Sequence, residues 1–218
     1  MRFGILFYKK RIIKKEKADA TKNLLILRKI IIMILWIQNI DNAVLNFIQA
    51  NLHNLLFDKM MPLISRIGDI STIWLIVAVI FLLIPKYRKY GILIVLAILL
   101  AAFTGEVVLK NLVERVRPCN MNTAFPMLIP RPTDFSFPSG HTSASFAAAT
   151  IIWKAKRKFG IFALLLASLI AFSRLYLYVH YPTDILAGMV LGLLCGLTVI
   201  AVIEFIDRKK SLDAEKTN

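Results

Sequence analysis

Three short stretches of the chain contain residues whose types and spacing suit the binding and reaction of a phosphate group. They lie at residues 110–118, 138–141 and 173–184. The cations of interest among them are Lys110, Arg117 and Arg174. A lysine ammonium is a compact point charge, whereas arginine guanidinium groups are planar forks that match phosphate oxygens. Because charges are costly in or beside a bilayer, their position at the ends of apolar segments indicates a binding site.

The remaining polar residues of these stretches suit anion binding and proton transfer. Ser139 and the backbone amides of Gly140 and His141 open an expected helix, and a helix N-terminus attracts anions. His180 is followed four residues later by Asp184, a carboxylate that can fix the imidazole tautomer and stabilise its charged form. His141 is a second imidazole that can act as an acid.

Each of these residues also has an ordinary explanation when it is taken alone. Lys110 could simply extend from a helix end to the membrane interface. Ser139 could serve only as a helix cap, and Asp184 could only cap the last helix. Either histidine could make a single hydrogen bond at the membrane surface. Chance does not readily gather two of the three histidines and three phosphate-binding cations on one membrane face, so the joint explanation is favoured.

The three stretches resemble the signature motifs of a known family. Lys-x6-Arg-Pro, Pro-Ser-Gly-His and Ser-Arg-x5-His-x3-Asp occur in the order of the motifs of the phosphatidic acid phosphatase type 2 superfamily. That superfamily shares its site with vanadium haloperoxidases and bacterial acid phosphatases. The resemblance covers about residues 40–206, and the combination of all three motifs is far more specific than any one of them.

The resemblance implies a role for each motif residue. His180 would attack phosphorus to give a phosphohistidine, Asp184 would orient His180, and His141 would protonate the leaving oxygen and later activate water. The phosphate oxygens would be held by Lys110, Arg117, Ser139, Gly140 and Arg174. The resemblance implies no metal and no cofactor, and the sequence has no obvious carboxylate cluster for Mg²⁺.

Composition places this chemistry in a membrane. Hydrophobic residues make up 58% of the chain and the mean hydropathy is +0.67, well above what soluble domains show. The net charge of +15 includes +8 in residues 1–32 and otherwise lies beside apolar runs. Such charge is typical of contact with anionic lipid, and with no nucleic-acid-binding motif present we expect no nucleic-acid partner.

Apolar runs predict an all-α, polytopic membrane bundle. Five crossings are expected at about 67–85, 90–109, 139–153, 159–179 and 184–206. Leu24–Ile40 could be a sixth, and Asn42–Met61 has the apolar spacing of a helix that lies along the interface. The basic clusters at 86–89, 154–158 and 208–210 then share one side, which the positive-inside rule assigns to the cytoplasm. The motif residues would consequently face the outside of a bacterial cell membrane.

Smaller features complete the predicted organisation. Residues 1–32 form a basic N-terminal segment, 33–210 a single membrane-embedded phosphatase domain and 211–218 a disordered tail.

Gly188, Gly192 and Gly196 form a ridge for close helix packing. Glu106 is expected to pair with Lys110. Three tyrosines suit an interfacial aromatic belt, namely Tyr176, Tyr178 and Tyr181. Cys119 is expected in an exposed outer loop, and Cys195 near the bilayer centre.

The predicted partners are membrane lipids and a lipid phosphate or pyrophosphate substrate. Residues 128–141 resemble the corresponding region of small bacterial undecaprenyl-pyrophosphate phosphatases, which favours undecaprenyl pyrophosphate. Phosphatidylglycerophosphate, phosphatidic acid and diacylglycerol pyrophosphate are alternatives. Two alternatives that are not enzymes are a membrane transporter and a catalytically inactive lipid-binding protein. The transporter is disfavoured because the charges lie at helix ends rather than mid-membrane. The sequence leaves the oligomeric state open.

Overall fold

The computed structural model describes the backbone of residues 2–216 and the side chains of residues 22–213. Contacts divide the chain into one unit of residues 1–43 and a second of residues 44–218. The first unit belongs to helix α1 (Arg2–Asn51), which runs without a break through the expected boundary at residue 32. Its segment Lys22–Asn51 is apolar and long enough to cross a membrane, and large apolar side chains between Leu24 and Trp36 are exposed.

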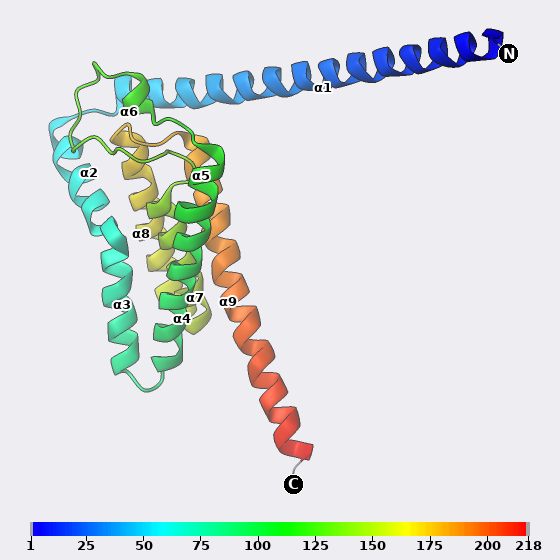
Figure 1. Ribbon diagram of the computed structural model, residues 1–218. Helices are drawn as coiled ribbons and strands as arrows, with labels where there is room; N and C mark the ends of the chain where they lie inside the picture. Colours follow the sequence, from blue (N-terminus) through cyan, green and yellow to red (C-terminus); the bar gives the residue numbers. More distant parts are fainter. Residues whose placement is uncertain (1, 217–218) are drawn as a thin grey trace. The chain divides into compact units, whose positions relative to one another are not determined.

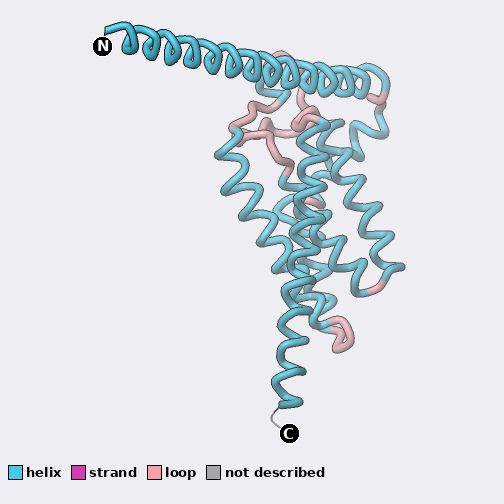
Figure 2. The backbone as a smooth tube through the Cα atoms, turned by 90° about the vertical axis from the view of Figure 1, so that its right-hand side faces the viewer, coloured by secondary structure: helices cyan, strands magenta, loops and turns pink. Residues whose placement is uncertain are grey.

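The second unit is a bundle of helices, with no strand among the described residues (Figures 1 and 2). Its elements after α1 are α2 (Leu55–Ile67), the 3₁₀ turn η1 (Asp69–Ser71), α3 (Thr72–Leu83), α4 (Arg88–Ala102), the π-helical η2 (Phe103–Leu109), α5 (Lys110–Val113), α6 (Pro118–Met121), α7 (Gly140–Ala155), α8 (Arg157–Tyr176) and α9 (Pro182–Lys216). Within the part of the chain whose side chains are described, four helices are long and apolar enough to cross a membrane, or five if the bent pair α2 and α3 forms one span. The all-helical membrane fold is therefore confirmed.

Helix α7 explains why the third expected crossing is poor in large apolar residues. It packs against α4, α8 and α9, and every residue from Thr142 to Ile152 is buried. A helix enclosed by protein does not need the long side chains that meet lipid, and small residues let its neighbours approach closely.

The glycine ridge of α9 packs against α7, as predicted. A Cβ atom added at Gly192 would lie 2.3 Å from the carbonyl oxygen of Ser143, and one at Gly188 would lie 2.7 Å from that of Ser139. Both separations are shorter than any ordinary contact, so only glycine permits this approach. The ridge thereby fixes the start of α7, which carries the second motif, beside the start of α9, which carries part of the third.

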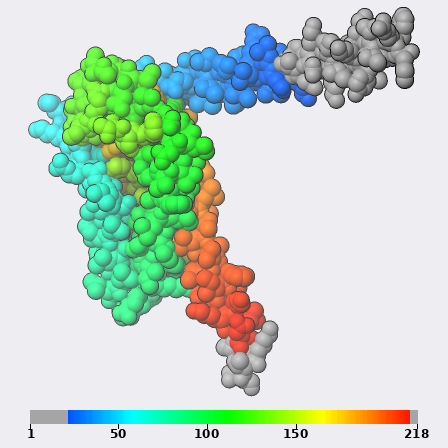
Figure 3. Space-filling model, viewed as in Figure 1, coloured from blue at the N-terminus to red at the C-terminus, as the bar shows by residue number. Residues whose placement is uncertain are grey.

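The basic clusters lie together at one end of the bundle and the motif residues at the other (Figure 1). Lys89 at the start of α4 pairs with Asp207 of α9. Lys154 at the end of α7 pairs with Glu204 at 2.7 Å. Figure 3 shows the segment between α6 and α7 covering the opposite end of the bundle. Both ends therefore have the charge arrangement that the topology predicts.

The predicted interfacial helix over Asn42–Met61 is wrong as a single element. Helix α1 ends at Asn51, and Asn54 begins α2 by accepting hydrogen bonds from the amides of Leu56 and Phe57 at 3.1 and 2.9 Å. An asparagine carboxamide is a strong N-cap, so it starts a new helix where apolar spacing alone suggests continuity. The crossing expected at 67–85 corresponds to α3, and the break lies at its start, where α2 and α3 meet at an angle of 53° through η1.

The C-terminal tail also differs from expectation. Helix α9 continues as far as Lys216, whereas a disordered segment was predicted from residue 211. Residues 217 and 218 lie outside the described part of the chain.

Candidate active site

His180 lies in the turn between α8 and α9 and is only 1% exposed. Tyr178 has a positive φ of 59°, which turns the chain back after α8 and directs the next residues into the bundle. Asp184 follows in the first turn of α9, with one carboxylate oxygen 3.6 Å from the Nδ1 atom of His180. That distance exceeds an ordinary hydrogen bond but places the carboxylate directly behind the imidazole.

Asp184 is itself held by three neighbours. Its carboxylate accepts hydrogen bonds from the Ser136 hydroxyl, from the Tyr181 amide at 2.8 Å and from Arg115 Nη1 at 2.6 Å. Arg115 also donates to the Thr183 hydroxyl at 2.7 Å. The carboxylate is therefore fixed from several sides before it acts on His180.

The other imidazole nitrogen of His180 is directed towards Arg117. Nε2 lies 2.9 Å from Arg117 Nη1, and because a guanidinium only donates, Nε2 must accept. The proton of the neutral ring is then on Nδ1, facing Asp184. Burial, together with the charges of Arg117 and Arg174, lowers the pKa of His180 to about 3 against the opposing effect of Asp184. A neutral ring with its lone pair on Nε2 is the form required of a nucleophile.

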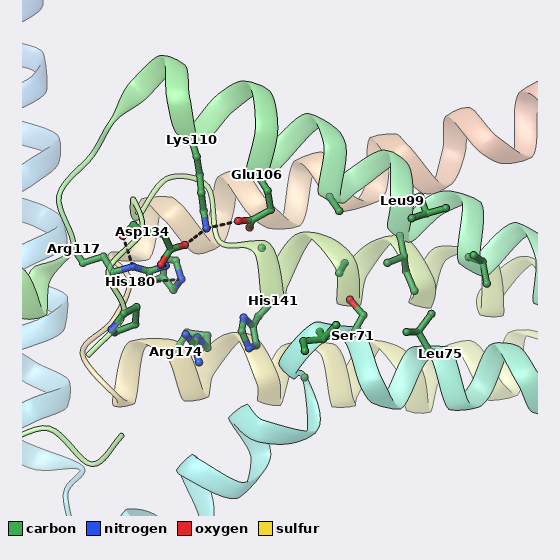
Figure 4. A pocket seen from close by; sticks show the side chains of 18 residues that line it. Ser71, Leu75, Leu99, Glu106, Lys110, Arg117, Asp134, His141, Arg174 and His180 are labelled. Carbon is green, nitrogen blue, oxygen red and sulfur yellow. Dashed lines mark hydrogen bonds and ion pairs between the residues drawn. The ribbon is translucent and has the colours of Figure 1, made fainter. Parts of the chain in front are cut away.

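Two of the expected phosphate-binding cations meet at one carboxylate (Figure 4). Lys110, which is buried at the start of α5, donates to Glu106 at 2.6 Å and also to Asp134. Arg117 donates through Nη2 to the Asp134 carboxylate at 2.9 Å and through Nε to the Asp134 carbonyl, also at 2.9 Å. The expected pair of Lys110 and Glu106 is confirmed, whereas the bridging role of Asp134 was not predicted.

Arg174 approaches the same pocket from α8. It is 5% exposed and donates through Nη1 to the Ser65 hydroxyl of α2, while its Nε atom is buried and has no hydrogen-bond partner among the described residues. A buried guanidinium N–H without a partner is costly, so Arg174 retains donor capacity for an anion in the pocket.

The residues of the second motif divide into two groups. Gly140 and His141 line the pocket, and a Cβ added at Gly140 would lie 2.1 Å from the Glu106 Oε1 atom, so a side chain there would require the Glu106 carboxylate to move. Ser139 is fully buried and does not line the pocket. Its hydroxyl instead accepts hydrogen bonds from the amide and hydroxyl of Thr142 at 3.4 and 3.0 Å, and its amide donates to the Asp184 carbonyl. The structure therefore places Ser139 as a cap that holds the motifs together.

His141 is directed across the pocket to η1. Its Nε2 atom lies 2.7 Å from the Asp69 carboxylate. The pair connects the start of α7 to the break between α2 and α3.

The pocket extends from these polar groups into an apolar channel. Its volume is about 530 Å³. The polar end contains His141, Arg174 and His180, whereas the other end is lined by side chains of α3 and α4, namely Leu75, Val95, Ile98, Leu99 and Ala102 (Figure 4). A site with this shape suits a ligand with an anionic head and an apolar chain.

Four polar residues of the site were not assigned a site role from the sequence. They are Asp69, Arg115, Asp134 and Ser136. Arg115 lies in the first motif but not at a signature position, Asp134 and Ser136 precede the second motif, and Asp69 lies in a distant turn, so no spacing rule connects them to the histidines. Acidic residues in an otherwise basic, apolar chain are the signal that could have indicated Asp69 and Asp134.

Two further sequence expectations are wrong. Tyr176 and Tyr181 are buried rather than arranged as an interfacial belt: the Tyr176 hydroxyl donates to Asp58 at 2.5 Å, and the Tyr181 ring lies 4.0 Å beneath the Arg115 guanidinium. Cys119 is completely buried in a cluster with Ile48, Met61 and Tyr176. Both errors arise because the polar loops fold over this end of the bundle instead of extending from it.

The fold and site together define a membrane-embedded protein of the phosphatase type. The model of the PAP2 superfamily matches residues 90–208, so the chain belongs to this superfamily, the one that its motifs resemble. It has the all-helical fold of PAP2 membrane phosphatases.

Known relatives agree with this assignment. An undecaprenyl-diphosphatase of Sulfolobus acidocaldarius is 34% identical over 61% of this chain and 64% of its own length. A decaprenylphosphoryl-5-phosphoribose phosphatase of Mycobacterium tuberculosis is 32% identical over 64% of this chain and 76% of its own length. The crystal structure of a transmembrane PAP2 type phosphatidylglycerolphosphate phosphatase from Bacillus subtilis has a TM-score of 0.65 and 28% identity, covering 78% of this chain and 87% of that one. The match to the Sulfolobus relative thus spans less than two thirds of that protein.

Proposed function

We propose that this protein hydrolyses the terminal phosphate of a polyprenyl pyrophosphate, with undecaprenyl pyrophosphate the favoured substrate. The observation that carries the proposal is the position of His180 Nε2 beside Arg117, at the polar end of a pocket whose other end is apolar. This arrangement presents a nucleophile and cations to a lipid headgroup while the channel accepts the chain.

The reaction follows from the proton positions. His180 Nε2 attacks phosphorus, and the bond between phosphorus and the leaving oxygen breaks, with His141 as the proton donor. Lys110, Arg117, Arg174 and the start of α7 at Gly140 stabilise the charge on the equatorial oxygens. The positive charge that develops on His180 is balanced by Asp184 behind Nδ1. Water, deprotonated by His141, then cleaves the phosphohistidine and releases inorganic phosphate.

Two observations favour a polyprenyl substrate. The Sulfolobus and Mycobacterium relatives are named for undecaprenyl and decaprenyl substrates. The apolar channel lies between α3 and α4 and suits a single polyprenyl chain entering beside the site. Phosphatidylglycerophosphate is the second candidate, favoured by the similarity to the Bacillus subtilis structure. Phosphatidic acid and diacylglycerol pyrophosphate share the same chemistry.

We also propose that the site faces the outside of a bacterial cell membrane. The support is the segregation of the basic clusters to the end of the bundle opposite the site, together with the positive-inside rule. A carrier lipid released at the outer face would then reach the pocket directly.

The test is phosphate release by purified, detergent-solubilised protein from a panel of lipids. The panel contains undecaprenyl pyrophosphate, phosphatidylglycerophosphate, phosphatidic acid and diacylglycerol pyrophosphate, each assayed with and without EDTA. We expect the highest kcat/KM on undecaprenyl pyrophosphate, no effect of EDTA, and competitive inhibition by vanadate, which adopts the five-coordinate geometry of the transition state. A higher kcat/KM on phosphatidylglycerophosphate would make that lipid the substrate in place of undecaprenyl pyrophosphate. Activity that is lost with EDTA and restored by Mg²⁺ would contradict the mechanism.

A further inference from the structure

The carboxylate of Asp134 is bound where a phosphate oxygen is expected. It accepts hydrogen bonds from both Lys110 and Arg117, two of the three cations that line the pocket. Partial burial raises the pKa of Asp134, but the hydrogen bond from Lys110 and the charge of Arg117 outweigh this and lower it to about 2. The group therefore stays ionised at neutral pH, and it cannot release the cations by taking up a proton.

The charge balance of the pocket makes this carboxylate an obstacle to substrate. The charged residues lining the pocket are the cations Lys110, Arg117 and Arg174 and the carboxylates Glu106 and Asp134. A phosphate dianion added to this set would leave the pocket net negative. If one carboxylate left, two net positive charges would face the dianion. Phosphate binding is therefore favoured when a carboxylate moves away.

Of the two carboxylates, Asp134 is the one that can move. Glu106 belongs to the helical segment η2, and its Oε1 atom lies against Gly140. The two side chains are similarly exposed, 49% for Asp134 and 43% for Glu106, but Asp134 lies in the loop between α6 and α7 rather than in a helix. The hydrogen bond from Arg117 Nε to the Asp134 carbonyl can hold the loop while the side chain rotates into solvent.

We propose that Asp134 is an internal competitor for the anion site, displaced by the substrate phosphate and rebound when inorganic phosphate leaves. The inference rests on the proposed phosphate-binding role of Lys110 and Arg117. Each incoming anion must replace the hydrogen bonds of Asp134, so the residue weakens the binding of substrate and product alike. The benefit of this competition is faster release of inorganic phosphate, because three clustered cations without a competing carboxylate would retain the product dianion.

The experiment compares Asp134→Asn with Glu106→Gln in purified, detergent-solubilised protein. Binding of inorganic phosphate is measured at pH 8 by titration calorimetry, and KM and the inhibition constant of phosphate by lipid hydrolysis. We expect Asp134→Asn to bind phosphate about tenfold more tightly, which corresponds to about 1.4 kcal/mol, with KM and the inhibition constant falling in parallel. Glu106→Gln removes the same charge beside Lys110 but leaves the bridge to Arg117, so its effect should be at most about threefold.

Asp134→Glu is the second variant, because it keeps the charge on a longer side chain. It should retain weak phosphate binding close to that of the wild type. Unchanged or weaker phosphate binding in Asp134→Asn would overturn the competitor role of Asp134 but leave the proposed function intact. The same holds if phosphate binding tightens equally in Asp134→Asn and Glu106→Gln. Failure of the wild type and of every variant to bind phosphate or hydrolyse lipid would overturn the proposed function as well.

Discussion

Asp69 and His141 form a hydrogen-bonded pair, at 2.7 Å, across the break that separates α2 from α3. The break is strained: Ile70 and Ser71 have positive φ values of 51° and 58°, a conformation that β-branched isoleucine rarely adopts. Strain of this kind persists where the surroundings enforce it, often at functional sites. Here it directs Asp69 towards the residue proposed as the general acid.

Replacing Asp69 by asparagine should therefore impair leaving-group protonation. We expect kcat on phosphatidic acid, whose leaving group is an alkoxide, to fall about tenfold, and kcat on a pyrophosphate lipid to fall less than threefold, with KM nearly constant. Asp69→Glu should restore part of the loss. The measurement is steady-state phosphate release on both substrates, and an equal loss on the two would show that Asp69 serves only the fold.

Arg115 should act on Asp184 without touching the substrate. It bonds Thr183 and Asp184 through one nitrogen and stacks on Tyr181, a geometry that lysine cannot reproduce. Arg115→Lys should lower kcat about tenfold and leave KM within about twofold, because Asp184 loses a fixed partner while the phosphate-binding cations are intact. The matched control is Arg131→Lys, since Arg131 binds the carbonyls of Thr123 and Phe125 instead. Similar losses in both variants would argue against a specific role of Arg115.

The two histidines should be separable by substrate. Because His180 is fully buried, alanine would leave a cavity, and glutamine is the better replacement. His180→Gln should lose at least about 10³-fold in kcat on every lipid, as expected when a nucleophile is removed. His141→Gln should keep more activity on pyrophosphates, whose leaving group needs less protonation. Equal residual activities on all substrates would contradict the two roles.

The pH dependence of stability provides an independent test of the buried His180. Its pKa of about 3 in the folded protein lies well below the ordinary value of 6.5. Between these values the unfolded chain binds a proton that the folded chain does not, so the free energy of unfolding falls as the pH falls from 6.5 towards 3. At pH 5 the loss is about 2 kcal/mol. His180→Gln should remove this term, and its melting temperature should drop less than that of the wild type between pH 7 and pH 5. Parallel decreases would mean that His180 titrates normally.

The sequence predicts the all-α membrane fold because long apolar runs and basic clusters are local signals. The site residues in the three motifs are likewise recognisable, since fixed spacings identify them. Asp69 and Asp134 were missed because their importance comes from pairing with residues far away in the chain. Ser139 shows the converse, since a motif position suited to phosphate is placed as a helix cap. Tertiary contacts of this kind leave no periodic pattern in the sequence.

The orientation of the site can be tested with introduced cysteines, since Cys119 is buried and is not the outer-loop reporter expected from the sequence. Met121, 70% exposed at the end of α6, lies at the site end of the bundle, and exposed Lys86 lies in the turn between α3 and α4 at the opposite end. Met121→Cys should react with a membrane-impermeant maleimide in intact cells, and Lys86→Cys only after permeabilisation. The wild type should remain unlabelled in intact cells, because both native thiols are buried. The reverse labelling pattern would place the pocket in the cytoplasm, and a carrier lipid released at the outer face could then not be the substrate.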